Sequence, residues 1–321
     1  MHAIVVTAHG GPDVLAWRGE PDPEPGPGQV LVEVRAAGVN FIDTYLRRGM
    51  YPSRPPYIPG SEGAGVVTAL GDGVDGLAVG DRVAWCDSPA SYAERVVVEA
   101  ARAVRVPDSI PDDVAATMLL QGLTADYLLD GAAHPRPGDT VLVHAGAGGV
   151  GLILTQLAVA AGLTVITTVS SDEKAALSRE AGAAHVLRYG PDLADQVRAL
   201  TDGEGVAVAY DGVGKDTFEA SLAATRVRGS IALFGAASGP VPPFDLQRLN
   251  PAGSLSVTRP TLAHFISDPA EFALRTSRFV SAVADGAVRI RVGATYPLRA
   301  AEQAHRDLES RATTGSVALI V

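Results

Sequence analysis

The pattern of hydrophobic and polar residues changes character near Pro137. Before this point, short Val- and Ala-rich runs alternate with Gly, Pro and Asp, at Gln29–Val39, Gly63–Gly71, Asp81–Cys86 and Tyr92–Glu99. Short β-type runs separated by turn residues are typical of an irregular, barrel-like β domain. The first third of the chain therefore predicts a domain of this kind.

After Pro137 the pattern predicts strands that alternate with helices of ten to fifteen residues. The expected strands are Thr140–His144, Thr164–Val169, His185–Tyr189, Val206–Asp211 and Ser230–Gly235, and two of the helices are Gly149–Gly162 and Asp172–Ala183. Such alternation predicts a parallel sheet with helices on both faces, a doubly wound α/β fold. This block extends to about Arg259.

The C-terminal segment is too short for a third domain. Its pattern predicts a long helix around Thr261–Asp285, a strand at Val288–Val292, a helix at Ala300–Ser310 and a strand at Ser316–Val321. We expect this segment to return to the first domain and complete it.

Composition and charge exclude several classes of protein. A length of 321 residues allows two ordinary domains. The net charge of −10 argues against a nucleic-acid binder, and the single cysteine, Cys86, excludes an internal disulfide and a cysteine-based zinc lobe. No apolar run approaches the roughly 20 residues that span a bilayer, and the N-terminus lacks the pattern of a signal peptide. We expect a cytoplasmic protein that binds neither membrane nor nucleic acid.

The stretch HAGAGGVG, residues 144–151, fits the dinucleotide pattern G-x-G-x-x-G with Gly146, Gly148 and Gly151. In a chain with 35 glycines this pattern alone is weak. Its context is informative, because it follows an apolar strand and opens an apolar helix, as a pyrophosphate-binding turn requires. A plain turn between strand and helix would need one glycine rather than four. The stretch therefore favours a nucleotide site.

The end of the next strand indicates which dinucleotide binds. An NAD site typically has Asp or Glu there, about 20 residues downstream, to bind the ribose 2′-hydroxyl. This chain has Val169, Ser170 and Ser171, with no carboxylate before Asp172, and Lys174 follows one turn into the helix. Hydroxyls and a cation in place of an acid favour NADPH, although Lys174 is also explained as a solvated surface residue.

Several motifs together identify a family. They are Ala36–Pro52 (AAGVNFIDTYLRRGMYP), Pro59–Val67 (PGSEGAGVV), Val79–Val83 (VGDRV), Gln121–Leu129 (QGLTADYLL), residues 144–151, Tyr210–Gly214 (YDGVG), Ser256–Leu262 (SVTRPTL) and Glu309–Leu319 (ESRATTGSVAL). With them the chain resembles, over essentially its whole length, the zinc-independent quinone oxidoreductases (ζ-crystallin-like) of the medium-chain dehydrogenase/reductase superfamily. The resemblance implies a GroES-like catalytic domain of residues 1–121, completed by residues 261–321, and an NADPH-binding Rossmann domain of residues 122–260.

The resemblance also bears on the metal. The zinc alcohol dehydrogenase branch carries GVC and GHE where this chain has Gly38 to Asn40 and Gly60 to Glu62, and its third ligand, a cysteine, would fall near Leu120 and Gln121. Asn, Ser and no thiol make a poor zinc site. Hydride addition to a plain ketone makes an alkoxide that needs a Lewis acid, whereas a quinone gives a phenolate-like oxygen, with a pKa near about 10 by analogy with tyrosine, and an enone gives a delocalised enolate. We therefore expect no metal and a quinone or enone as substrate.

The resemblance implies these roles for individual residues. The acceptor's carbonyl oxygen would meet Asn40, Tyr45 and Tyr51, of which Asn40 also lies near the coenzyme. The coenzyme would contact Thr124, Tyr127, Gly148, Gly149, Val150, Val213, Phe234, Gly235 and Arg259, and its 2′-phosphate Ser170, Lys174, Tyr189 and Arg311. Alternative roles stay open: both tyrosines as packing residues, Thr124 as a helix cap, and Arg311 as a partner of Glu309. His144 is expected to be a buried, hydrogen-bonded core residue, and Asp43 to orient its neighbours.

These expectations define an NADPH-dependent quinone oxidoreductase. An NADPH-dependent enoyl or 2-alkenal reductase is the nearest alternative, and an NADPH-binding protein without turnover is a third. The strand expected at Ser254–Thr258 would leave a sheet edge unpaired, so we predict a C2 homodimer in which two copies of this strand meet.

Overall fold

A computed structural model describes all 321 residues, which form two compact units. The first unit contains Met1–Gln121 and Phe272–Val321, and the second contains Gly122–Glu271. The chain passes from the first unit to the second within helix α2 (Asp112–Tyr127) and returns within helix α8 (Pro269–Ala284).

The second unit is built on a six-stranded parallel sheet. Its strands are β8 (Thr140–Val143), β9 (Thr164–Val169), β10 (His185–Arg188), β11 (Val206–Asp211), β12 (Thr225–Leu233) and β13 (Ser256–Thr258). They lie in the order β10-β9-β8-β11-β12-β13, so the order reverses between β8 and β11. This is the strand order of the doubly wound dinucleotide-binding fold, which confirms the predicted fold class for this part.

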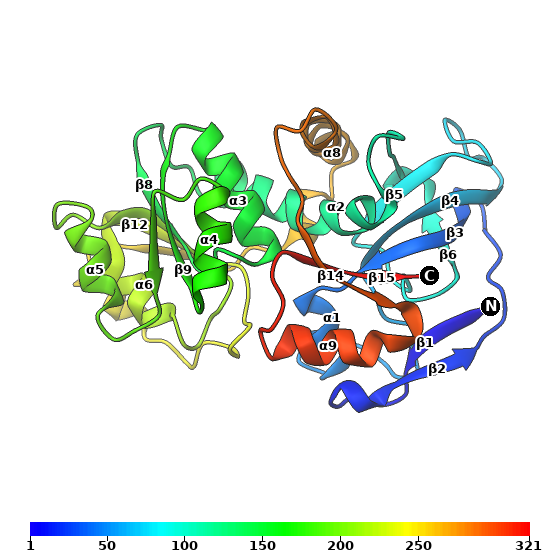
Figure 1. Cartoon of the computed structure of the whole chain (residues 1–321), viewed down its shortest axis with the longest axis horizontal. Helices are drawn as coiled ribbons and strands as arrows, with labels where there is room; N and C mark the ends of the chain where they lie inside the picture. Colours follow the sequence, from blue (N-terminus) through cyan, green and yellow to red (C-terminus); the bar gives the residue numbers. More distant parts are fainter. The chain divides into compact units, whose positions relative to one another are not determined.

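Helices connect these strands, as Figure 1 shows in green and yellow. They are α3 (Gly149–Ala160), α4 (Asp172–Glu180), α5 (Leu193–Ala199) and α6 (Phe218–Ala224), with the short turn η4 (Leu246–Leu249) between β12 and β13. The turn η3 (Leu128–Ala132) precedes β8, and α7 (Leu262–Phe265) follows β13. Gly162 ends the α3 segment with a φ of +78°, which glycine adopts without a Cβ penalty. Ser171 caps α4, because its side chain accepts a hydrogen bond from the Lys174 amide.

The first unit contains a seven-stranded, mostly antiparallel sheet. Its strands are β3 (Gln29–Gly38), β4 (Glu62–Leu70), β5 (Arg82–Cys86), β6 (Arg95–Glu99), β7 (Val104–Arg105), β14 (Val292–Pro297) and β15 (Ser316–Ile320). Strand β3 is its centre, because it pairs with β4, β6 and β15. The C-terminal strands thus lie in one sheet with strands from the beginning of the chain (Figure 1).

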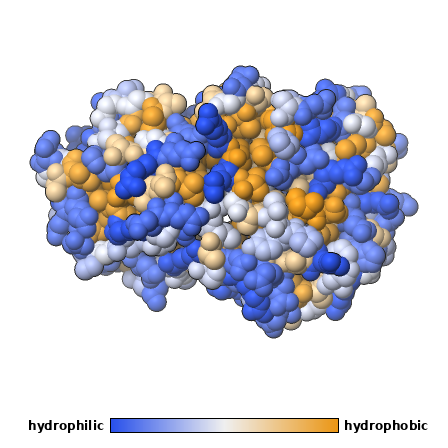
Figure 2. All heavy atoms as spheres, viewed as in Figure 1, coloured by the Kyte–Doolittle hydropathy of each residue, from blue (hydrophilic) through white to orange (hydrophobic).

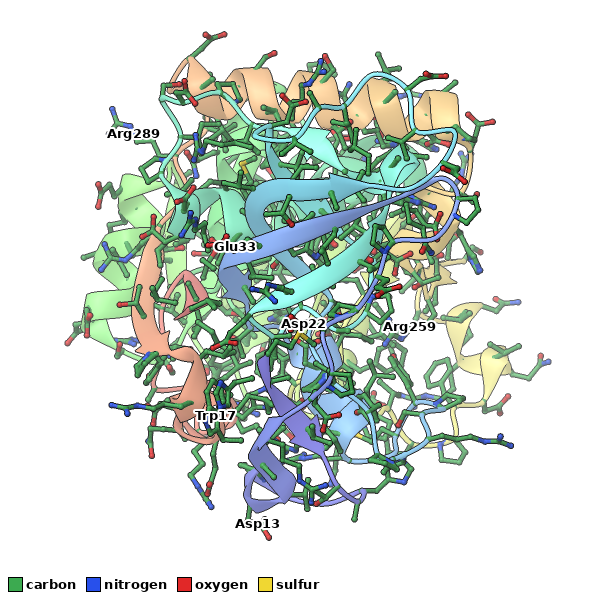
Figure 3. The ribbon with its side chains drawn as sticks, turned by 90° about the vertical axis from the view of Figure 1, so that its right-hand side faces the viewer. Asp13, Trp17, Asp22, Glu33, Arg259 and Arg289 are labelled. Atoms are coloured by element: carbon green, nitrogen blue, oxygen red, sulfur yellow. The ribbon has the colours of Figure 1, made fainter.

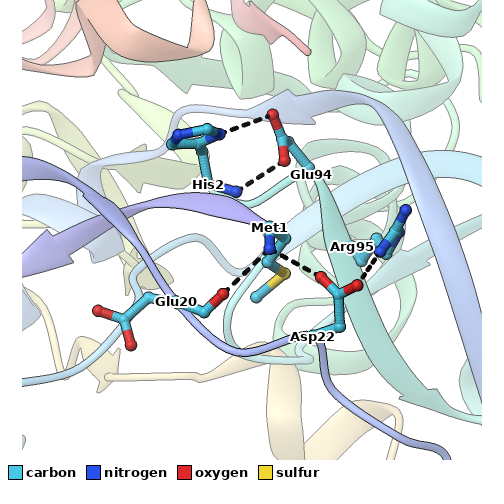
Figure 4. A network of polar contacts seen from close by, with 6 residues as sticks. All are labelled: Met1, His2, Glu20, Asp22, Glu94 and Arg95. Atoms are coloured by element: carbon cyan, nitrogen blue, oxygen red, sulfur yellow. Dashed lines mark hydrogen bonds and ion pairs between the residues drawn. The ribbon is translucent and has the colours of Figure 1, made fainter.

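The remaining elements of the first unit are helices α1 (Phe41–Arg47) and α9 (Ala301–Glu309), the turns η1 (Pro12–Val14), η2 (Ala100–Arg102) and η5 (Leu298–Ala300), and a hairpin of β1 (His2–Val6) and β2 (Leu15–Gly19). Figure 3 shows Asp13 and Trp17 on this hairpin. Within the hairpin, His2 stacks on Trp17. Figure 4 shows that His2 also pairs with Glu94 and that the amino group of Met1 contacts Asp22, which pairs with Arg95. These contacts tie the hairpin to β6.

Two sequence predictions for the C-terminal part are wrong. The long helix expected around Thr261–Asp285 is split into α7 and α8, because Pro269 cannot donate a main-chain hydrogen bond and starts a new helix instead. Asp268 caps that helix through the amides of Ala270 and Glu271. The strand expected at Val288–Val292 begins only at Val292, where pairing with Ser316 of β15 starts.

On the face drawn in Figure 2, hydrophilic residues separate the exposed apolar residues into groups. The most exposed large apolar side chains in the chain are Val227, Leu246, Leu274 and Val79. No helix combines the length and apolar character needed to cross a membrane.

Candidate functional site

The glycine-rich loop, residues 144–151, connects β8 to α3, so the predicted strand–loop–helix context is confirmed. A Cβ at Gly151 would overlap the carbonyl oxygen of Ala145, and a Cβ at Gly146 would lie 2.5 Å from Cβ of Thr167. Both positions therefore need glycine for close backbone packing. Gly148 is the N-cap of α3 and offers no side chain to cap the helix.

This loop fits the pyrophosphate of a dinucleotide. The first amides of α3 have no acceptor within the helix, and the helix dipole places partial positive charge at the same end. The loop follows β8, beside the point where the strand order reverses, and ligands of such sheets bind at that point. The predicted contacts Gly148, Gly149 and Val150 all belong to this helix start.

The turn after β11 lies on the other side of the reversal point. The buried carboxylate of Asp211 accepts hydrogen bonds from the amides of Val213 and Gly214, both at 2.9 Å, and from the Thr217 hydroxyl. This turn packs tightly on the end of β12, because a Cβ at Gly235 would overlap the carbonyl oxygen of Gly212. Val213, Phe234 and Gly235, three predicted coenzyme contacts, are thereby brought together.

His144 is a core residue, as the sequence predicts. It is 1% exposed, and its Nε2 lies 3.0 Å from Oγ of Ser221, which donates to Asp211. Nε2 therefore carries the proton, and Nδ1 accepts from the Thr168 hydroxyl at 2.9 Å. Burial lowers the pKa of this imidazole, which the nearby Asp211 opposes. His144 is a neutral bridge between β8, β9 and α6.

Three of the four predicted 2′-phosphate residues, Ser170, Lys174 and Tyr189, follow β9 and β10 in the second unit. Val169 is paired with Arg188, so Ser170 and Tyr189 are the next residues on adjacent strands. The Tyr189 hydroxyl accepts a hydrogen bond from the Ala145 amide at 3.0 Å. Lys174 lies in the first turn of α4. Arg188, which pairs with Asp172, adds a cation that the sequence reasoning missed.

Three further predicted coenzyme residues, Thr124, Tyr127 and Arg259, belong to the second unit. Thr124 and Tyr127 lie inside α2, so the alternative that Thr124 caps a helix is wrong. The Tyr127 ring stacks on Phe265 with centroids 4.3 Å apart. Burial raises the pKa of Tyr127, and the charge of Arg259 opposes that shift. Arg259, labelled in Figure 3, follows β13.

Asn40 lies in a buried hydrogen-bond network of the first unit. It precedes α1, and its Nδ2 donates to Oε1 of Glu62 at 2.7 Å, while its Oδ1 accepts from Nε2 of Gln121 at 3.2 Å. Oγ of Ser316 donates to Oε1 of Gln121, and the Leu120 amide donates to Oε2 of Glu62. The residues at the positions of the zinc ligands in the related branch thus include two amides hydrogen-bonded to each other.

Asp43, in α1, is the centre of a second buried network. Its carboxylate accepts hydrogen bonds from the main-chain N–H of Asn40, from the Ser61 hydroxyl at 2.7 Å and from the Tyr92 hydroxyl at 3.2 Å. Oη of Tyr92 also lies 3.1 Å from Nε2 of His305. Asp43 is thus hydrogen-bonded to three neighbours, and its orienting role stays a prediction.

The second network continues to a buried ion pair. Nδ1 of His305 accepts from Arg47, and Arg47 forms an ion pair with Glu309 at 2.6 Å. Burial, followed by the charge of Arg47, lowers the pKa of His305 to about 3. His305 is therefore neutral, with its proton on Nε2 facing Tyr92.

Tyr45 and Tyr51 pack edge to face, with ring centroids 5.6 Å apart, and Tyr45 also contacts Phe41. Arg311 follows α9 in a left-handed conformation, with a φ of +61°. Glu309, the alternative partner considered for Arg311, forms ion pairs with Arg47 and Arg48. The proposed roles of Tyr45, Tyr51 and Arg311 stay predictions.

Sequence reasoning missed the roles of Glu62, Tyr92, His305 and Ser316. Glu62 stands within the motif PGSEGAGVV, whereas His305 is 213 residues from Tyr92 and Ser316 is 195 residues from Gln121. No local pattern joins such pairs, and only the pairing of β15 with β3 brings the C-terminal residues to this place.

The two buried carboxylates predict how stability depends on pH. Burial raises the pKa of Asp43 to about 6 and that of Glu62 to about 8. Groups with raised pKa values stabilise the fold fully below their unfolded values, and this stability is lost as the pH rises through the folded values. At about 1.4 kcal/mol per unit, the shift of Glu62 corresponds to about 5 kcal/mol.

We therefore expect the unfolding free energy to fall more steeply between pH 5.5 and 9 for the wild type than for Glu62→Gln. Denaturant unfolding of both proteins at the two pH values measures this difference. Equal changes for the two proteins would show that Glu62 does not titrate in this range.

Comparisons with known proteins agree with both units. Residues 26–108 match the family model described as alcohol dehydrogenase GroES-like domain, and residues 149–277 match zinc-binding dehydrogenase. No group of three or more His, Cys, Asp or Glu side chains in the 321 residues is arranged to hold a metal ion.

The relatives cover nearly the whole chain. A quinone oxidoreductase of Pseudomonas aeruginosa is 44% identical over 99% of this chain and 98% of its own length. A 2-haloacrylate reductase of a Burkholderia species is 41% identical, with the same coverage of both. A mycobacterial protein solved in complex with NADPH is 53% identical, with a TM-score of 0.98 and complete coverage of both chains.

Proposed function

Because the chain belongs to the quinone oxidoreductase family of the medium-chain dehydrogenase/reductase superfamily, we propose that it is an NADPH-dependent quinone oxidoreductase. Its GroES-like domain is proposed to be residues 1–121 completed by the returning C-terminal segment, and its NADPH-binding domain is the part between them. The compact units divide at Gln121/Gly122 and at Glu271/Phe272, so the second boundary lies about ten residues after the position expected from the sequence. The observation that carries this proposal is the glycine-rich loop, whose tight packing at Gly146 and Gly151 suits a dinucleotide and which a relative solved with NADPH supports.

In this proposal the second unit binds NADPH. The amides of Gly149 and Val150 hold the pyrophosphate, and Val213, Phe234 and Gly235 position the nicotinamide side. Ser170, Lys174 and Tyr189 bind the 2′-phosphate, with Lys174 supplying charge and both hydroxyls donating hydrogen bonds. Thr124, Tyr127 and Arg259 complete the coenzyme contacts of this unit.

The first unit binds the acceptor. When bound, NADPH supplies a hydride, which leaves negative charge on the acceptor's oxygen. The amide of Asn40 and the phenols of Tyr45 and Tyr51 donate hydrogen bonds to this oxygen. Such donors suffice for a quinone, because its reduced oxygen is phenolate-like and far less basic than an alkoxide.

A panel of acceptors tests the reaction. NADPH oxidation is followed with a 1,4-quinone, a 1,2-quinone, an enoyl thioester, a 2-alkenal and 2-chloroacrylate, each repeated with NADH. The proposal expects the highest kcat/KM with a quinone and NADPH. Coenzyme binding without turnover of any acceptor would instead identify an NADPH-binding protein that is not an enzyme.

The second candidate is an NADPH-dependent reductase of enones or 2-alkenals. The similarity to a 2-haloacrylate reductase over nearly the full chain favours it, since that protein's name describes reduction of an activated alkene. A higher kcat/KM for an alkene than for either quinone would select this candidate.

The residues at the zinc-ligand positions of the related branch predict that this protein holds no zinc. Asn40 and Gln121 are hydrogen-bonded to each other, and Ser61 donates to Asp43, so these side chains have other partners than a metal. Purified protein is expected to contain no stoichiometric zinc and to keep its activity with a chelator. About one zinc per chain in a metal analysis would contradict this.

The assembly is expected to be a C2 homodimer in the cytoplasm. Strand β13 (Ser256–Thr258) forms one edge of the six-stranded sheet, and an unpaired edge favours pairing with a second copy. Light scattering at micromolar concentration should give twice the mass of one chain. The mass of a single chain would argue against this pairing.

A further inference from the structure

Four side chains form a continuous hydrogen-bonded row inside the first unit: Ser316, Gln121, Asn40 and Glu62. They come from β15, α2, the residue before α1, and β4, and none is more than 6% exposed. The three successive donor–acceptor distances are 2.7, 3.2 and 2.7 Å. The row therefore connects distant parts of the sequence through side-chain contacts alone.

This row has a direction. Above its pKa the Glu62 carboxylate only accepts hydrogen bonds, so it requires an N–H from Asn40. Asn40 then turns Oδ1 toward Gln121, which must present its own NH₂ group, and the Oε1 of Gln121 accepts from the Ser316 hydroxyl. The Leu120 amide occupies the other oxygen of Glu62. Each amide is thus held in one of its two orientations.

The fold makes room for Glu62 although its burial is costly. A Cβ at Gly38 would overlap this carboxylate, so glycine is required there. Both hydrogen-bond donors to Glu62 are neutral amides rather than cations. A buried carboxylate without a cation destabilises a protein, and neither pyrophosphate nor phosphate binding uses it.

We propose that Glu62 is a positioning residue for reduction of the acceptor, holding the Asn40 amide so that an N–H, and not Oδ1, meets the acceptor's oxygen. An amide nitrogen carries two hydrogens, and Glu62 takes one, which leaves one donor for that oxygen. The proposal rests on the proposed function, in which Asn40 is a donor to the acceptor.

The variant Glu62→Gln tests this orientation with almost no change of shape. The introduced glutamine can accept from the main-chain amide of Leu120 with its oxygen and donate to Oδ1 of Asn40 with its nitrogen. The Asn40 and Gln121 side-chain amides would then flip, so that donor and acceptor are exchanged at each hydrogen bond of the row. Assays are run at pH 9, above the pKa of Glu62, which burial raises to about 8. We expect kcat with a quinone to fall roughly tenfold to 100-fold. Complete loss of one oxyanion donor typically costs about 100-fold or more, and a turned amide is expected to cost up to that amount.

Two other readouts separate positioning from a structural role. The KM for NADPH should stay within about twofold of the wild type, because Glu62 belongs to the first unit. The unfolding free energy at pH 9 should not fall, since the substitution removes a buried charge while its hydrogen bonds can be remade. Glu33→Gln is the matched control, because the side chain of Glu33 on β3 (labelled in Figure 3) is half-exposed, and this change should alter none of these values.

The double variant Glu62→Gln with Gln121→Glu distinguishes orientation from charge. It restores one carboxylate to the row at position 121, on the other side of Asn40 from position 62, and Ser316 can still donate to it. The proposal expects kcat to stay low, because the Asn40 amide remains turned over. Ser316→Ala provides a milder test, since it releases Gln121 and should lower kcat several-fold without loss of fold.

Three results would overturn the proposal. They are a kcat of Glu62→Gln within twofold of the wild type, a loss of kcat that only parallels a loss of unfolding free energy, and recovery of kcat in the double variant. Absence of turnover in the wild type as well would refute the proposed function itself, and the proposal with it. The expected pattern is a loss of kcat in a stable protein with an unchanged KM for NADPH.

Discussion

Gly151→Ala is expected to weaken binding of NADPH and NADH alike by about 100-fold. A Cβ at this position would overlap the carbonyl oxygen of Ala145, which is main chain and cannot move alone. The loop would therefore shift away from the start of α3. Losing two charge-assisted hydrogen bonds to the pyrophosphate, at roughly 1.5–3 kcal/mol each, corresponds to a loss of about 100-fold to 10,000-fold, of which the lower end is expected if the loop shifts only slightly.

Calorimetric titration with each coenzyme measures the effect, and the melting temperature shows whether the variant is folded. Gly19→Ala is a suitable control, because a Cβ added at Gly19 in β2 would have no atom within 4 Å and the φ of Gly19 is not positive. Unchanged affinity for both coenzymes in a folded Gly151→Ala protein would place the pyrophosphate elsewhere.

Lys174→Ala is expected to weaken NADPH binding by about one to two powers of ten and to leave NADH nearly unchanged. The 2′-phosphate carries close to two negative charges, and one charge-assisted hydrogen bond is worth roughly 1.5–3 kcal/mol. At about 1.4 kcal/mol per tenfold, this gives the stated range. NADH lacks the phosphate and gains nothing from the lysine.

Steady-state kinetics with both coenzymes test this prediction. Arg179→Ala provides the control, because Arg179 is an exposed cation in the last turn of the same helix, α4. Equal losses for NADPH and NADH, or no loss for either, would mean that Lys174 is a solvated surface residue. Arg188→Ala tests whether the second cation at this end of the sheet shares the phosphate.

The nucleotide-binding half could be predicted from the sequence because its signals are local. Strands β8 to β11 and helices α3 and α4 each follow from a continuous run of residues, and the glycines mark the one loop between β8 and α3. The alternating Val288–Val292 run gives a wrong prediction, because a strand also needs a partner, and pairing with β15 starts only at Val292.

The networks around Asn40 and Asp43 could not be predicted in the same way. The family resemblance implies that Asn40 binds the acceptor, yet its contacts with Glu62 and Gln121 depend on β3, β4 and α2 meeting in space. His305 has no spacing typical of a ligand, and its role emerges only beside Tyr92 and Arg47. Tertiary packing, rather than local pattern, assembles these groups.

The central claim is that this chain transfers hydride from NADPH to a quinone. The most direct measurement mixes the wild-type protein with limiting NADPH and excess 1,4-benzoquinone without oxygen, and follows coenzyme oxidation together with hydroquinone formation. The account predicts protein-dependent formation of one hydroquinone per NADPH oxidised, with a kcat/KM at least tenfold higher than with NADH, in line with roughly 1.4 kcal/mol of discrimination. Coenzyme oxidation no faster than without protein, or a preference for NADH, would contradict it.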